Sequence, residues 1–203
     1  MTTKCRALEL ELPQTILIYL ADTVAALDAA GVTYAIGGAV AMAAHGYTRA
    51  TTDVDVFIDP NDRPAALRAL RNNSYGASFR VERIHGDEHW IATRGDGGQK
   101  YRVDLLFPSA DPDWSAIQVP DMVEGVPFFS PEMIALSKLY VNTYEAVTDI
   151  VVMLRSGIVD PTVARQTLTN MDPELLGAWA EIETIAATVR PARQRPAPKG
   201  KKS

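Results

Sequence analysis

Apolar positions along the chain follow two spacings, one typical of helices and one typical of strands. The segment 15–30 has apolar residues at helical spacing and is followed by Gly31, a residue type that often ends helices. After it, short β-branched and aromatic runs alternate with helical stretches, and glycine or proline separates them. The pattern therefore predicts helices at 15–30, 39–45 and 61–71, and strands at 32–36, 51–58, 78–84, 88–93 and 102–107.

The part of the chain beyond residue 126 carries helix-start signals. Ser130-Pro131-Glu132 supplies a capping side chain, a proline at the first helical position and an acidic residue in the first turn. Asp160-Pro161 and Asp172-Pro173 repeat this signal, whereas residues 108–126 look like a loop. Helices are predicted at 131–143, 145–156, 161–169 and 173–189. The predicted fold class is α+β: a small mixed β-sheet with flanking helices, followed by a C-terminal helical region.

Two acidic residues interrupt the apolar strand predicted at 51–58. Because successive strand side chains point to opposite faces, Asp53 and Asp55 share a face with Phe57, and the intervening valines face the core. Acidic residues are poor strand formers, and neighbouring carboxylates repel each other unless a cation lies between them. Such conflicts are expected at functional sites, and a divalent metal is a common partner for carboxylates. A solvated acidic face is the alternative interpretation.

A third carboxylate and a pair of glycines extend this pattern. Asp104 would lie beside the acidic pair if the strand at 102–107 pairs with the strand at 51–58. Three carboxylates can hold two magnesium ions, the arrangement that clamps the attacking and leaving oxygens in phosphoryl transfer. Gly37 and Gly38 lie between a predicted strand and a predicted helix, where backbone N–H groups favour an anion. A plain turn is the alternative for the glycines.

Other kinds of site find little support. Neither a GxGxxG nor a GxxxxGK[ST] motif occurs, which argues against a dinucleotide-binding fold and a P-loop. The single cysteine, Cys5, cannot form an internal disulfide and lies outside every predicted core element. The segment His85–His89 offers two histidines and two acids as zinc ligands, but it lacks the HExxH order, and a turn explains it simply.

The spacing of the acids and glycines resembles the nucleotidyltransferase superfamily that includes DNA polymerase beta. The pattern is GG-x10-R-x-T-x-D-x-D, with one further aspartate on a later strand. The residues that match it are Gly37, Gly38, Arg49, Thr51, Asp53, Asp55 and Asp104. The match covers roughly residues 15–107. The helical remainder, with Lys138 and Asp149, resembles the AbiEii-type branch, which includes toxins of bacterial toxin–antitoxin and abortive-infection systems.

The resemblance implies magnesium-dependent transfer of an NMP from an NTP to an acceptor hydroxyl, with release of pyrophosphate. Asp53, Asp55 and Asp104 would be the catalytic and metal-binding residues, holding two Mg²⁺ ions. The implied nucleotide-binding residues are Gly37, Gly38, Arg49, Thr51 and Lys138. Many members of the superfamily have serine at the second glycine, so this chain would leave phosphate binding to backbone and basic groups.

The basic residues keep alternative roles. Lys138 is the best candidate for a phosphate contact, and an ordinary solvated helix lysine is its alternative. Arg49 would either touch phosphate or brace the loop that precedes the acidic strand. Asp149 has a functional and a structural interpretation of equal standing.

Two classes of acceptor stay open. The helical region and the basic tail favour a toxin-like enzyme, which would place nucleotides on RNA, with a tRNA 3′ end as the first candidate, and would have a cognate antitoxin as partner. A small-molecule enzyme of the antibiotic-adenylating kind would use an acidic body to attract a cationic acceptor. A catalytically degenerate relative, used only for binding, is the non-enzyme alternative.

Charge and length limit the remaining possibilities. Residues 190–203 contribute six positive charges to a net charge of −5, which leaves −11 on the rest of the chain. This Pro-rich tail is expected to be disordered, either as a solubilising end or as a contact for a polyanion.

We predict a catalytic core at 1–127, a helical region at 128–189 and this tail at 190–203. Because no signal peptide or membrane span is evident, a cytoplasmic location without a membrane partner is expected.

Overall fold

In the computed structural model, the described residues are 10–72, 78–84, 87–93, 102–108 and 117–188. Within them, seven strands form one sheet in the order β3-β4-β5-β2-β1-β7-β6. The strands are β1 (Tyr34–Ile36), β2 (Asp53–Ile58), β3 (Ser78–Ile84), β4 (Asp87–Thr93), β5 (Arg102–Leu106), β6 (Asp121–Val123) and β7 (Val126–Phe128). The sheet is mixed, because β2 runs parallel to β5 and antiparallel to β1.

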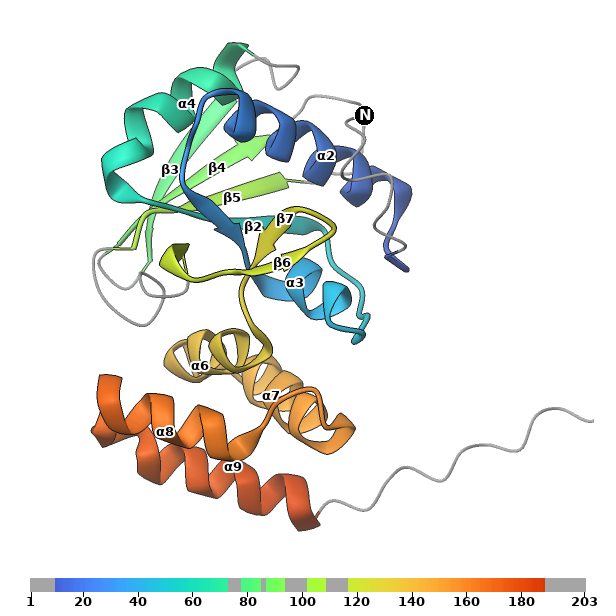
Figure 1. The fold of residues 1–203 in the computed structure, drawn as a ribbon, viewed down its shortest axis with the longest axis vertical. Coiled ribbons are helices and arrows are strands. Elements are labelled where there is room, and N and C mark those ends of the chain that lie inside the picture. Colours follow the sequence, from blue (N-terminus) through green and yellow to red (C-terminus); the bar gives the residue numbers. More distant parts are fainter. Residues whose placement is uncertain (1–9, 73–77, 85–86, 94–101, 109–116, 189–203) are drawn as a thin grey trace, which may run out of the picture.

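The helices form two groups around this sheet (Figure 1). Those in the sheet-containing part are α2 (Gln14–Ala29), α3 (Gly38–Ala44) and α4 (Arg63–Asn72), with the 3-10 turn η1 (Pro60–Asp62). Those that follow the sheet are α6 (Pro131–Val141), α7 (Tyr144–Ser156), α8 (Pro161–Met171) and α9 (Leu176–Thr188), with the 3-10 turn η2 (Pro173–Leu175). Helix α3 contacts both β2 and α6, so it joins the two groups. The predicted α+β class is confirmed.

The two faces of β2 differ in the way that the alternation of its residues predicts. Val54, Val56 and Ile58 are fully buried on one face, which belongs to the hydrophobic core that α2 helps to cover. Asp53 and Asp55 are only partly buried on the other face. This alternation places the acidic residues at the solvent-accessible side of a central strand, where a ligand can reach them.

The helix-start signals act as predicted in the C-terminal helices. The side chain of Ser130 accepts a hydrogen bond from the backbone N–H of Met133, 3.3 Å away, and Asp160 accepts one from Thr162 at 2.8 Å. These contacts satisfy N–H groups that the first helical turn leaves unpaired. The Asp172-Pro173 signal begins the 3-10 turn η2 instead, and the regular helix α9 starts after it.

The hairpin β6–β7 replaces part of the loop predicted at 108–126, so the loop prediction is wrong for its last residues. Glu124 and Gly125 both have positive φ, at 49° and 78°, which suits a tight two-residue turn between antiparallel strands. Each strand has only three residues, too few to show an alternating pattern in the sequence. Strand β7 joins the sheet beside β1 and spans the boundary predicted after residue 127.

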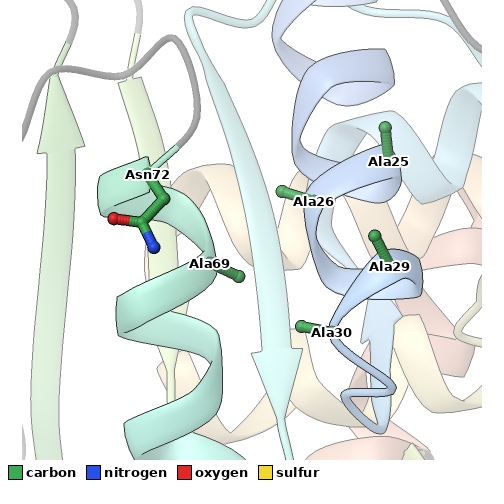
Figure 2. A pocket seen from close by; sticks show the side chains of 6 residues that line it. All are labelled: Ala25, Ala26, Ala29, Ala30, Ala69 and Asn72. Carbon is green, nitrogen blue, oxygen red and sulfur yellow. The ribbon is translucent and has the colours of Figure 1, made fainter.

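An open hollow of about 370 Å³ lies between α2 and α4 (Figure 2). The residues that line it are Ala25, Ala26, Ala29, Ala30, Ala69 and Asn72. Because this lining contains no titratable group, it offers nothing for acid–base or metal chemistry. None of the helices in the described ranges is long and apolar enough to cross a membrane.

Candidate functional site

Pairing of β2 with β5 brings the three predicted carboxylates together. The two strands are parallel, and Asp55 lies opposite Asp104 while Asp53 lies opposite Arg102. Residues opposite each other in a sheet share a face, so both strands direct these four side chains to the same side. Asp104 is only 2% exposed, whereas the Asp53 side chain is 25% exposed. The pairing on which the interpretation of Asp104 depended is present, and within the site Asp104 is buried while Asp53 is partly exposed.

The glycine turn lies directly over this acidic face. The backbone N–H of Gly37 donates to the carbonyl of Asp55 at 2.9 Å, and Gly38 has a positive φ of 58°. A Cβ at Gly38 would lie 2.8 Å from Asp55 Cγ and would overlap the carboxylate, and a Cβ at Gly37 would overlap the Phe57 ring. Both glycines are therefore required by their contact with β2.

Replacing Gly38 with alanine is expected to lower the free energy of unfolding by about 2 kcal/mol or more, since a non-glycine residue in the left-handed region costs about 1–2 kcal/mol before any overlap. Gly157 has a φ of 74°, and no atom lies within 4 Å of the position that a Cβ would take there, so Gly157→Ala is the matched control. Gly157→Ala should lower the free energy of unfolding by about 1 kcal/mol. Urea denaturation of both variants measures the difference.

The same Gly38→Ala change in an Asp55→Ala background separates strain from overlap. Without the carboxylate, the cost of the alanine should fall most of the way to that of Gly157→Ala, and the remaining difference should reflect the Cβ of residue 55 at 3.2 Å. An equal cost of Gly38→Ala in both backgrounds would show that the Asp55 side chain does not restrict this position.

Arg102 links two of the three carboxylates. Its Nε lies 2.9 Å from both side-chain oxygens of Asp104, and its Nη2 lies 3.2 Å from Asp53 Oδ2. Burial alone would lower the pKa of Arg102, but the neighbouring carboxylates, with Asp104 first, outweigh burial and raise it above the ordinary value. The guanidinium therefore stays charged and offsets part of the repulsion between the acids.

Thr51 positions the first carboxylate. Its hydroxyl donates to Asp53 Oδ1 at 2.6 Å, and the threonine itself is 9% exposed. Asp53 thus has one oxygen held by a hydroxyl and the other held by Arg102. The contact of Thr51 with a nucleotide stays a prediction, and its visible role is to orient Asp53.

Arg49 and Lys138 belong to a second ionic cluster, centred on Asp149 of α7. Lys138 Nζ lies 2.7 Å and Arg49 Nε lies 3.0 Å from Asp149 Oδ2, while Arg49 Nη1 reaches Glu145 at 3.0 Å. The Asp149 side chain is only 5% exposed. Of the two roles expected for Arg49, the brace is the one visible here, since it ties the loop before β2 to α7. A phosphate contact of Lys138 stays a prediction.

The carboxylates suit a hard divalent cation in their chemistry and in their placement on adjacent strands. In the part of the chain that the structure describes, however, no three His, Cys, Asp or Glu side chains are arranged to hold a metal ion as they stand. The Arg102 guanidinium bridges Asp53 and Asp104 in this arrangement. The donor atoms suit a divalent cation in their chemistry, and the carboxylate side chains would have to rotate toward one another to hold one.

Sequence reasoning missed Arg102, although a signal was present. Arg102 and Asp104 are two residues apart in a strand, so they share a face, and their pairing could have been inferred from that spacing. Sequence reasoning also missed the ion pair between Arg49 and Glu145. These residues lie about 100 positions apart, so no local pattern indicates that they meet. The histidine segment 85–89 and the basic tail 190–203 lie outside the residues whose side chains are described.

Neither a protein-family model nor a curated protein sequence matches the chain. Its structure is similar to that of ANT(2″)-Ia in complex with adenylyl-2″-tobramycin, with 18% identity, a TM-score of 0.51, and coverage of 85% of this chain and 99% of the other. JHP933 from Helicobacter pylori matches with 14% identity, a TM-score of 0.50, and coverage of 85% and 82%.

A Thermotoga maritima protein described as a candidate nucleotidyltransferase matches with 15% identity and a TM-score of 0.52, over 73% of this chain and 98% of the other. At such identities the similarity concerns the fold. The chain therefore has the α+β fold seen in nucleotidyltransferase-like proteins.

Proposed function

We propose that the chain is a magnesium-dependent nucleotidyltransferase, which moves an NMP from an NTP to an acceptor hydroxyl and releases pyrophosphate. The observation that carries this proposal is the alignment of Asp55 with Asp104 on adjacent parallel strands, with Asp53 on the same face. The fold similarity to nucleotidyltransferase-like structures supports the same kind of activity.

Asp53, Asp55 and Asp104 would hold the metal, and bound Mg²⁺ would neutralise charge on the reacting phosphoryl group. Asp104, the most deeply buried of the three, would also help to activate the acceptor hydroxyl. The Gly37-Gly38 turn lies against Asp55, so its backbone would face the triphosphate beside the metal ligands. The chain's own contribution is mainly positioning, because phosphoryl transfer needs little covalent chemistry from the protein.

The acceptor is the open part of the proposal. The toxin-like interpretation, with RNA as acceptor and an antitoxin as partner, rests on the sequence resemblance of the helical region and on the basic tail. The small-molecule interpretation rests on two observations. The first is charge: the net charge of the chain is −5, and without the six positive charges of residues 190–203 the charge on residues 1–189 is −11. The second is the similarity of the fold to that of ANT(2″)-Ia. An acidic body attracts cationic acceptors and repels RNA.

Incubation of the protein with each of the four labelled NTPs and Mg²⁺ separates these classes. One reaction contains total RNA, another contains tobramycin and related polycationic compounds, and a third contains no acceptor. Label on RNA supports the toxin-like assignment, and label on the small molecules supports the antibiotic-adenylating kind. Failure to label any acceptor with any NTP would favour the degenerate, binding-only alternative.

A further inference from the structure

Arg102 holds the oxygens that a metal ion would need. Its Nε lies 2.9 Å from both oxygens of Asp104, and Nη2 lies 3.2 Å from Asp53 Oδ2. The remaining oxygen of Asp53 accepts the Thr51 hydroxyl. A cation that ligates Asp53 Oδ2 and Asp104 Oδ2 would compete with the guanidinium for the same two atoms.

The guanidinium and a metal ion would also repel each other, because both are positively charged. In the arrangement shown, Arg102 supplies one positive charge to three neighbouring carboxylates, which lowers their mutual repulsion. A divalent ion at the same carboxylates supplies more charge and would repel a guanidinium that stayed in contact. The two cations thus compete for one set of ligands.

The position of Arg102 allows it to leave. It is the first residue of β5, and its side chain is 40% exposed, whereas the Asp104 side chain that it contacts is 3% exposed. Rotation of the arginine toward solvent would break two charge-assisted interactions without opening a cavity in the core. The carboxylates would stay on the adjacent strands β2 and β5, and their side chains would be free to rotate toward a metal ion.

We propose that Arg102 is a positioning residue that stands in for the metal ion, holding Asp53 and Asp104 in place until a divalent cation displaces it. This inference rests on the proposed function, since the metal is the one that the nucleotidyltransferase site would bind. It adds that metal affinity is set by a competing side chain of the protein itself. Arg102 therefore stabilises the metal-free protein and weakens metal binding at the same time.

Substitution of Arg102 separates these two effects. In Arg102→Met, the melting temperature of the metal-free protein should fall, because three carboxylates lose their counter-ion. Its affinity for Mn²⁺ should rise about tenfold, the change expected when a metal no longer displaces a charge-assisted hydrogen bond. Arg102→Lys keeps the charge, but an ammonium group cannot bridge two carboxylates as a planar guanidinium does. The Mn²⁺ affinity of Arg102→Lys should therefore lie between that of the unaltered protein and that of Arg102→Met.

The experiment measures free Mn²⁺ by electron paramagnetic resonance and the melting temperature by circular dichroism, with and without Mn²⁺. Arg68 on the exposed side of α4 provides the control variant Arg68→Met, which should behave like the unaltered protein. The predicted result is a lower metal-free melting temperature and a larger Mn²⁺-induced rise for Arg102→Met. If that variant does not fold without metal, folding on addition of Mn²⁺ supports the proposal, and Arg102→Lys supplies the affinity comparison.

Two other outcomes overturn different claims. Equal or weaker Mn²⁺ binding in both Arg102 variants, beside clear binding in the unaltered protein, would refute the competition and leave the proposed function standing. Absence of Mn²⁺ binding in the unaltered protein and in every variant would refute the metal site, and the proposed function with it.

Discussion

Asparagine in place of Asp55 is expected to reduce NMP transfer by at least about 100-fold, a loss comparable to removal of one preorganised electrostatic group from an active site. The amide keeps nearly the same shape but loses the charge that a metal ligand needs. Asp55 lies opposite Asp104 on the neighbouring strand, and its carboxylate also lies against Gly38. It is therefore the acid that contacts both the glycine turn and the second acidic strand. Transfer of labelled nucleotide to the acceptor identified for the unaltered protein measures the effect.

Asp121→Asn provides a matched control for this change. Asp121 is also a strand aspartate, but it is exposed on β6, at the edge of the sheet. The control should transfer nucleotides at the normal rate, and both variants should keep their circular dichroism spectra. Normal transfer by folded Asp55→Asn would remove this carboxylate from the site.

The second large effect concerns stability. Replacing Asp149 with alanine is expected to lower the free energy of unfolding by about 3–5 kcal/mol, the cost of removing one partner from a buried ionic cluster. Asp149 is the common partner of Lys138 and Arg49, and their side chains are only 13% and 26% exposed. Lys138 would then lose the carboxylate that neutralises it in a poorly solvated place, and Arg49 would keep only the exposed Glu145. Guanidinium chloride denaturation measures the loss.

Glu145→Ala is the control for the same cluster. Glu145 also contacts Arg49, but its side chain is 70% exposed, so its loss should cost less than about 1 kcal/mol. Equal costs for the two substitutions would show that Asp149 does not organise the cluster. The prediction matters for function because Asp149 fixes both basic residues that the sequence suggests for phosphate contact.

The central part of the fold could be predicted from the sequence, because its local signals agree with its tertiary environment. Alternation in β2, the glycine that follows α2 and the helix-start signals at Ser130 and Asp160 each reflect constraints that act over a few residues. The hairpin β6–β7 could not be predicted, since its three-residue strands gain their stability from pairing with β1, which is distant in sequence.

The acidic residues of the candidate site could be predicted from the sequence, whereas the contacts of its basic residues could not. Asp53, Asp55 and Asp104 stand out because acids conflict with the apolar strands that carry them. Arginine at the start of a strand raises no such conflict, so only the spacing of Arg102 from Asp104 indicates its role. The pairing of Arg49 with Asp149 depends on how α7 packs beside the loop before β2, and this is decided by tertiary structure.

Calorimetric titration of an NTP into the protein tests the central claim most directly. We predict binding that requires Mg²⁺ and that is lost in Asp53→Ala, with the fold of the variant verified by circular dichroism. Binding of equal affinity without Mg²⁺, or binding unchanged in folded Asp53→Ala, would contradict the assignment of these carboxylates as a metal-dependent nucleotide site.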